Sequence, residues 1–189
     1  MFAVTLMTRM FQKGTIKVES VVSGDKITVS SLNRGYGTPS YLGSFELFSS
    51  AEGMILVNEL PLEEYLYAVV PSEMPASYEL EALKAQAVCA RSYAYNQTQG
   101  LSYPEYNAHV DDSTSFQVYG NSKEQESAVR AVDETRGQKL WYQNQVVTAY
   151  YYSTSCGKTT GIEAWGTTPD GTKSVSAKCG DLQGRWKFI

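Results

Sequence analysis

A single carboxylate stands between two prolines in the stretch PSEMP, residues 71–75. Proline fixes its own φ angle and biases the preceding residue toward extended conformations, so we expect Glu73 in a short, stiff connection between two helices. A general acid needs such positioning, and apolar neighbours such as Met74 would raise its pKa and keep it protonated near neutral pH. The residues alone favour an ordinary alternative, a solvated loop glutamate or one that hydrogen-bonds the N-terminus of the following helix.

Other residues with chemical potential form weaker patterns. The stretch SCGKT ends like a phosphate-binding loop, but that motif needs glycine where this chain has Tyr152, so nucleotide binding is not expected. Cys156 and His109 could act as nucleophile and base, although nothing in the sequence brings them together. Asp111 and Asp112 could form a second acid or a cation site, but an acidic turn is the commoner meaning.

The composition limits the classes of function. A chain of 189 residues can bury a core without disulfides or metals, and a net charge of −4 without a long basic run argues against nucleic acid as a partner. Fourteen tyrosines and three tryptophans suit a core or contacts with sugar faces. Cys89, Cys156 and Cys179 match no zinc or redox spacing, so a Cys156–Cys179 disulfide and three free thiols both stay open.

Neither a membrane span nor a convincing signal peptide is visible, because no stretch approaches about 20 apolar residues and the first residues lack a basic segment followed by an apolar one. On the residues alone we expect either a cytosolic protein or a piece of a longer one.

Apolar periodicity predicts a mixed α+β fold of helices and antiparallel strands, with a β-rich N-terminal segment. Strands are expected in a hairpin on both sides of Gly24-Asp25, in SFELF and MILVNEL, in two strands that turn near residues 143–145, and in the final GRWKFI. Helices are expected from Pro61 to Pro71, from Tyr78 to about Thr98, and from about Lys123 to Arg136 with Ser122 as cap and Gly137 as stop. The loop at residues 33–40 is the best boundary between a segment 1–40 and a domain 41–189.

The second predicted helix has an unusual distribution of side chains. One face carries an apolar stripe and the other is small and uncharged, which indicates packing on two sides. The stripe consists of Leu80, Leu83, Ala87, Ala90 and Ala94, and the opposite face of Ala82, Ala85 and Cys89. Lys84 and Arg91 lie seven residues apart at the edge of the stripe, where a cation must find a partner.

Four blocks of this sequence resemble those of the stage II sporulation protein D family, whose relatives include the amidase enhancer. They are YLGSFEL, VNELPLEEYLYAVVPSEMPASYELEALKAQAVCARSYAY, DDSTSFQVYG and AYYYSTSCGKTTGIEAWG, which together run from Tyr41 to Gly166. The resemblance implies a lytic transglycosylase that cleaves peptidoglycan glycan strands stripped of stem peptides, beside a partner amidase, during engulfment in sporulation. It implies that Glu73 is the catalytic acid.

A single carboxylate fits this chemistry. Hydrolysis of a glycoside ordinarily uses two carboxyl groups. A lytic transglycosylase instead lets the 6-hydroxyl of the sugar attack C1, so one residue can protonate the leaving oxygen and then accept the hydroxyl proton, which gives a 1,6-anhydro end. No metal or cofactor is required.

The resemblance also implies further glycan-binding residues in the matched blocks. These are Lys84, Gln86, Arg91, Gln117, Tyr151, Ser153 and Ser155, with the Tyr151 ring available to a sugar face. The alternative for Lys84 and Arg91 is a pair of structural ion-pair donors.

Three departures from the family pattern limit what is carried over. Some members place a zinc site in the block that ends QVY, but this chain has Asp111, Ser115 and Phe116 there, so no zinc is expected. Cys156 stands where glycine is usual. The membrane anchor of the family is absent, so an extracytoplasmic, membrane-associated or wall location follows from kinship alone. A non-catalytic wall-binding enhancer of an N-acetylmuramoyl-L-alanine amidase and a cysteine hydrolase using Cys156 remain as alternatives.

Overall fold

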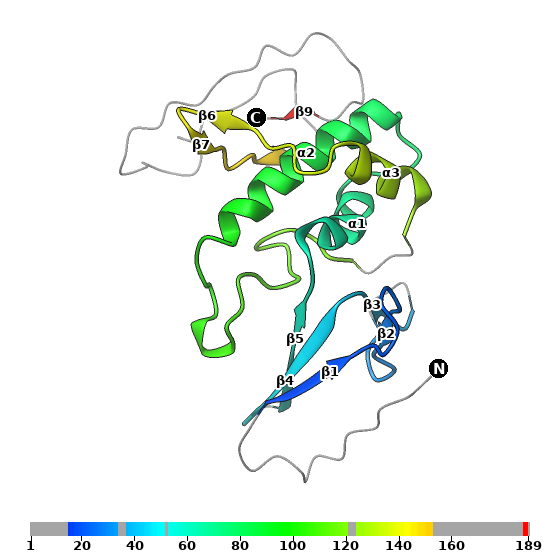
Figure 1. Ribbon diagram of the computed structural model, residues 1–189, viewed down its shortest axis with the longest axis vertical. Coiled ribbons are helices and arrows are strands. Elements are labelled where there is room, and N and C mark those ends of the chain that lie inside the picture. The colour runs from blue at the N-terminus through cyan, green and yellow to red at the C-terminus, as the bar shows by residue number, and fades with distance from the viewer. Residues whose placement is uncertain (1–14, 34–36, 52, 121–123, 153–186, 189) are drawn as a thin grey trace.

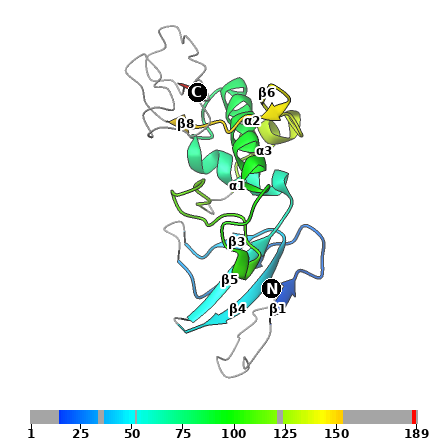
Figure 2. The ribbon, with the colours of Figure 1, turned by 90° about the vertical axis from the view of Figure 1, so that its left-hand side faces the viewer.

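The computed structural model describes residues 15–33, 37–51, 53–120, 124–152 and 187–188. Its N-terminal strands form one part of the molecule and its helices form another, and β5 leads directly from the first into the second (Figure 1). Figure 2, turned by 90°, shows the same division. The predicted mixed α+β fold is confirmed.

The N-terminal sheet is antiparallel, in the strand order β1-β4-β5. Its strands are β1 (Ile16–Glu19), β4 (Ser44–Ser50) and β5 (Gly53–Glu59), and a separate two-stranded sheet pairs β2 (Ile27–Thr28) with β3 (Ser40–Tyr41). The predicted strands in SFELF and MILVNEL are therefore confirmed.

The predicted hairpin around Gly24 is wrong, because β1 pairs with β4 and β2 with β3. β4 alternates half-buried and buried residues, and Phe45 and Leu47 lie on its buried face. Val18 and Ile16 stand opposite these two residues and pack against the same cluster. Pairing with a long strand that carries an apolar face covers more apolar surface than a local hairpin would.

The predicted boundary near residue 40 divides paired strands. β1 and β2 lie before it, and their partners β4 and β3 lie at or beyond it. The segment 1–40 thus forms no separate unit in its described residues, and the chain changes from sheet to helix at Pro61 instead.

A tight approach of two backbones fixes the entry to β4. Gly43 has a φ of +78°, and a Cβ built there would lie 2.1 Å from the carbonyl oxygen of Glu59. The side-chain amide of Asn58 donates to the carbonyl oxygens of Leu42 and Ser44 at 2.9 and 3.0 Å. Glycine is therefore required at this position.

Three helices form the other part: α1 (Leu62–Glu73), α2 (Leu80–Gln97) and α3 (Glu126–Glu134). The prediction that Pro71 ends the first helix is wrong, since α1 continues through it to Glu73. The helix ends before Pro75 instead, because Met74, the residue preceding that proline, is extended with φ −139° and ψ 131°. Glu73 is therefore the last helical residue and does not lie in a loop.

The helices share one apolar core in which small residues let the backbones approach closely. Its fully buried members are Leu66, Val69, Val70, Met74, Leu83, Ala87, Ala90, Ala128, Ala131 and Val132. The apolar stripe predicted on α2 is thus confirmed, with Ala94 also buried and Leu80 at its margin. Cys89 on the opposite face is buried too.

The remaining strands lie beyond α3. β6 (Trp141–Tyr142) and β7 (Gln145–Val146) form the predicted hairpin, whose turn residues Gln143 and Asn144 have φ angles of 48° and 62°. β8 (Tyr151–Tyr152) pairs with β9 (Lys187–Phe188), in agreement with the strand predicted at the end of the chain. A short 3₁₀ turn, η1 (Pro104–Tyr106), lies between α2 and α3, and the predicted cap Ser122 lies outside the described residues. Among the described helices, none has the length and apolar character needed to cross a bilayer.

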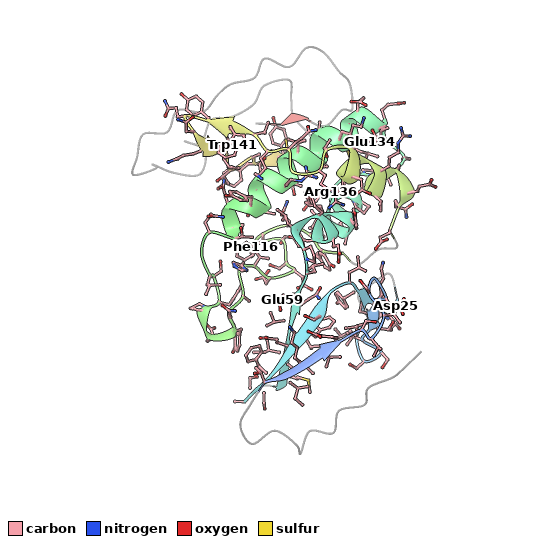
Figure 3. The ribbon with its side chains drawn as sticks, viewed as in Figure 1. Asp25, Glu59, Phe116, Glu134, Arg136 and Trp141 are labelled. Atoms are coloured by element: carbon pink, nitrogen blue, oxygen red, sulfur yellow. The ribbon has the colours of Figure 1, made fainter. Side chains whose placement is uncertain are left out.

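Three stacked tyrosines connect the two parts. The ring of Tyr119 is parallel to those of Tyr65 on α1 and Tyr41 on β3, with centroid distances of 5.3 and 6.1 Å. Tyr119 contacts both the helical core and the core of the sheet. The segment that carries it also carries Phe116, which Figure 3 labels near the junction of the two parts.

Candidate active site

Glu73 lies at the C-terminal end of α1, where a neighbouring segment is fixed against the helix. Its Oε1 accepts a hydrogen bond from the backbone N–H of Val118 at 2.8 Å. The hydroxyl oxygen of Ser72 accepts one from the N–H of Gly120 at 3.1 Å, and that hydroxyl donates to the carbonyl of Ala68 at 2.6 Å. Two consecutive residues of α1 therefore bind alternate N–H groups of residues 118–120, which sets the position of the carboxylate.

Burial raises the pKa of Glu73 above its ordinary value. Hydrogen bonds from the Val118 N–H and from Tyr151 act in the opposite direction, because they stabilise the ionised form. The carboxyl group remains half-buried, so it is both partly removed from water and accessible. Such a group can hold a proton at a higher pH than a solvated glutamate and still has two donors ready for its anion.

Gln117 organises the groups around this carboxylate. Its side chain is 2% exposed, and its Nε2 donates to the Tyr151 hydroxyl at 2.9 Å and to the Ala90 carbonyl at 3.3 Å. Its Oε1 accepts from the hydroxyl of Tyr65 at 3.4 Å. The Tyr151 hydroxyl accepts from Gln117 and hydrogen-bonds Glu73, so an ordered relay of donors ends at the carboxylate.

Several phenols surround Glu73 and remain protonated donors. Burial is the main cause that raises the pKa of Tyr65, Tyr93 and Tyr151, and the negative charge of Glu73 raises each of them further. The three residues come from α1, α2 and β8, so three elements converge on one carboxyl group.

Two cations predicted to bind glycan are engaged in ion pairs. Lys84 contacts Glu81 at 2.8 Å and Glu134 at 2.6 Å, which ties α2 to α3 at the surface. Figure 3 labels Glu134 at this end of α3. The predicted alternative, a structural ion-pair donor, accounts for this geometry without glycan.

Arg91 is fully buried and holds the three helices together. Its Nη2 and Nε donate to the carboxylate of Glu63 on α1 at 2.7 and 2.9 Å. It also donates to the backbone carbonyls of Val132 at 3.0 Å and Gln138 at 3.2 Å. These contacts engage its guanidinium with protein groups, so we assign Arg91 to support of the fold, and its predicted contact with glycan stays untested.

Gln86 differs from the other predicted site residues because it is buried without a partner. Its side chain is fully inaccessible, and neither its amide nitrogen nor its amide oxygen has a hydrogen-bond partner, the described parts of the chain included. Its predicted role in binding glycan stays a prediction.

The alternative chemistry considered from the sequence receives little support from the described residues. The pKa of Asp111 is lowered by hydrogen bonds from Ser113 and Tyr103, as in an acidic turn. His109 is exposed, and no group of three or more His, Cys, Asp or Glu residues that could hold a metal occurs in the part of the chain that the structure describes. Ser153, Ser155, Cys156 and Cys179 lie outside the described residues.

Sequence reasoning missed three participants: the backbone N–H of Val118, the hydroxyl of Tyr65, and Tyr93. Tyr65 and Ser72 are seven residues apart in one helix, so their common face was a usable signal. A backbone donor leaves no signal in the sequence, because almost every residue carries one.

Comparison with known proteins gives consistent matches. The family profile described as stage II sporulation protein matches residues 50–142. The chain is 41% identical over 119 residues to an uncharacterised protein of Brachyspira hyodysenteriae, covering 62% of this chain and 32% of that protein. It is 40% identical over 126 residues to stage II sporulation protein D of Bacillus subtilis, covering 59% of this chain and 37% of that protein. It is 44% identical over 94 residues to the amidase enhancer of the same organism, covering 50% of this chain and 12% of that protein.

The chain therefore spans about a third of the length of two of these relatives and a smaller share of the third. No solved structure matches it significantly.

Proposed function

Because the chain belongs to the stage II sporulation protein D family, we propose that it is a lytic transglycosylase that cleaves glycan strands of bacterial peptidoglycan, with Glu73 as its single acid and base. The observation that carries the proposal is the placement of this carboxyl group. It is half-buried, its pKa is raised, and it is held by the Val118 N–H and the Tyr151 hydroxyl. These properties suit a residue that must donate a proton and then take one back.

The proposed reaction has two proton transfers. Protonated Glu73 donates to the glycosidic oxygen, the bond from that oxygen to C1 of the muramic acid breaks, and the next sugar leaves with a free hydroxyl. The 6-hydroxyl of the muramic acid attacks C1, and the Glu73 carboxylate accepts its proton. The product is a 1,6-anhydro end and the acid is regenerated. Between the transfers, the Val118 N–H and the Tyr151 hydroxyl stabilise the carboxylate.

The proposal includes the substrate form and the location. We propose that the preferred strands are those stripped of stem peptides, and that the protein acts outside the cytoplasm on the cell wall in sporulation. The relative named stage II sporulation protein D supports the association with sporulation. The groups that stabilise the positive charge at C1 are not part of the proposal.

Mass spectrometry of the products tests the activity. Glycan strands with and without stem peptides are incubated with wild type, with Glu73→Gln and with Glu64→Gln, which changes a glutamate of the same helix outside the site. We expect anhydro-muramyl ends from wild type and Glu64→Gln, and none from Glu73→Gln. Reducing ends would mean ordinary hydrolysis with a second carboxylate and would overturn the proposed mechanism.

A second candidate function is a non-catalytic wall-binding enhancer of an amidase, which the name of one relative suggests. Both candidates predict binding to glycan, so binding does not separate them. An enhancer would raise the rate at which a purified cell-wall amidase releases stem peptides, and Glu73→Gln would leave that stimulation unchanged. A folded wild type that binds strands, stimulates the amidase and yields no cleaved strands would favour the enhancer.

A further inference from the structure

Two tyrosines beside Glu73 form an aromatic pair that the proposed mechanism does not use. The rings of Tyr93 on α2 and Tyr150, the residue before β8, have centroids 5.9 Å apart and planes at 68°. Tyr150 is 42% exposed and Tyr93 is half-buried. An edge-to-face pair uses one face of one ring and one edge of the other, so most of its aromatic surface stays available.

The pair lies close to the proposed acid. The charge of Glu73 contributes to the raised pKa of Tyr93, which places the two groups within electrostatic reach. Tyr150 precedes Tyr151, whose hydroxyl contacts Glu73, and consecutive Cα atoms are about 3.8 Å apart. Figure 2 shows β8 at the helical end of the molecule, and Tyr151 packs against the core formed by the helices.

Alternation along the extended chain separates the roles of two adjacent tyrosines. Successive side chains of a strand point to opposite faces. Tyr151 faces the core with its hydroxyl on Gln117 and Glu73, so its ring is committed to packing. Tyr150 is exposed and contacts Tyr93 instead. The ring predicted from the sequence to meet a sugar face is thus better placed at position 150 than at 151.

We infer that Tyr150, supported by Tyr93, forms a sugar-binding subsite next to Glu73 that holds a neighbouring saccharide of the glycan strand by stacking on its apolar face. The inference rests on the proposed function for the choice of ligand. Hexopyranoses present patches of C–H groups that suit uncharged aromatic faces, and a polymer substrate needs sites beyond the cleaved bond. Binding there contributes affinity and fixes which bond lies over the acid.

The test measures binding in a chain that cannot cleave. Soluble glycan strands without stem peptides are titrated calorimetrically into Glu73→Gln, alone and combined with Tyr150→Ala, Tyr150→Phe or Tyr142→Ala. Tyr142 is a matched control because it is 58% exposed on β6, next to the Trp141 labelled in Figure 3. We expect Tyr150→Ala to weaken binding about three- to tenfold, and Tyr150→Phe and Tyr142→Ala to leave it unchanged.

Two readouts separate this inference from the proposed function. Cleavage by wild type is measured beside cleavage by Tyr150→Ala, which should raise KM more than it lowers kcat. If wild type cleaves strands and Tyr150→Ala binds and cleaves like Tyr142→Ala, the subsite is refuted while the function stands. If wild type cleaves nothing and Tyr150→Ala still loses binding, the subsite stands and the catalytic proposal fails. A lower melting temperature for Tyr150→Ala with unchanged affinity would assign the pair to packing and overturn the inference.

Discussion

Replacing Arg91 with alanine should strongly destabilise the protein. The guanidinium is fully buried and donates to Glu63, a carboxylate on another helix with only 15% of its side chain exposed. Its removal would leave that carboxylate without its cation and the carbonyls of Val132 and Gln138 without this donor. Breaking a buried pair from one side typically costs about 3–5 kcal/mol, because the remaining charge stays desolvated. Folded proteins are stable by about 5–15 kcal/mol, so much of the total is at stake.

Urea unfolding followed by circular dichroism at pH 7 measures this loss. Arg136→Ala is the matched control: the Arg136–Asp133 pair is exposed, with 57% and 46% of the two side chains accessible, and its loss should barely move the midpoint. The double variant Glu63→Gln/Arg91→Met should lose less than the sum of the single variants, because it removes both charges together.

The reasoning is refuted if Arg91→Ala unfolds at the wild-type urea concentration. Unchanged stability together with weaker binding of glycan strands would return Arg91 to the glycan-binding set that the sequence indicated.

Four further outcomes follow from the structure. Gln117→Met should lower kcat more than it raises KM and lower stability by about 1–3 kcal/mol, measured by cleavage kinetics and urea unfolding, because a buried amide that orients donors is lost. Glu73→Gln should raise the melting temperature above neutral pH, since burial raises the pKa of this carboxyl and its ionisation costs stability as pH rises through that pKa; the gain should vanish below about pH 4.5. Gly43→Ala should destabilise more than Gly137→Ala in thermal melts, because both have positive φ but only Gly43 has a carbonyl in the way. Cys89 should resist iodoacetamide until the protein unfolds, as peptide mass spectrometry would show, because burial raises the pKa of its thiol to about 12.

The helices could be predicted because their signals are local. The apolar stripe of α2 repeats at helical spacing, and Leu83, Ala87, Ala90 and Ala94 are buried as that spacing requires. The pairing of β1 could not be predicted in this way, because its partner is chosen by Phe45, more than twenty residues away. A turn signal at Gly24-Asp25 competes with that distant apolar face, and the face determines the pairing.

The candidate site divides along the same line. Glu73 could be singled out because two prolines flank it within five residues. The relay through Gln117 and Tyr151 could not, because it joins side chains that are 34 residues apart in sequence. Arg91 shows the reverse error: a cation beside an apolar stripe was correctly expected to need a partner, but the sequence does not show that the partner is Glu63.

The prolines act on Glu73 in a different way from the one that the sequence suggested, and the result favours the proposed acid more. Pro71 removes one N–H from the last turn of α1, yet the helix continues because the preceding Val70 is fully buried in the core. Pro75 forces Met74 out of helical geometry, so Glu73 becomes the final helical residue. The C-terminal end of a helix carries partial negative charge from its free carbonyl groups, which disfavours a carboxylate. Burial and the helix terminus therefore act together to keep the acid protonated. A helix that ended at Pro71 would have placed Glu73 in solvated loop, where neither effect operates.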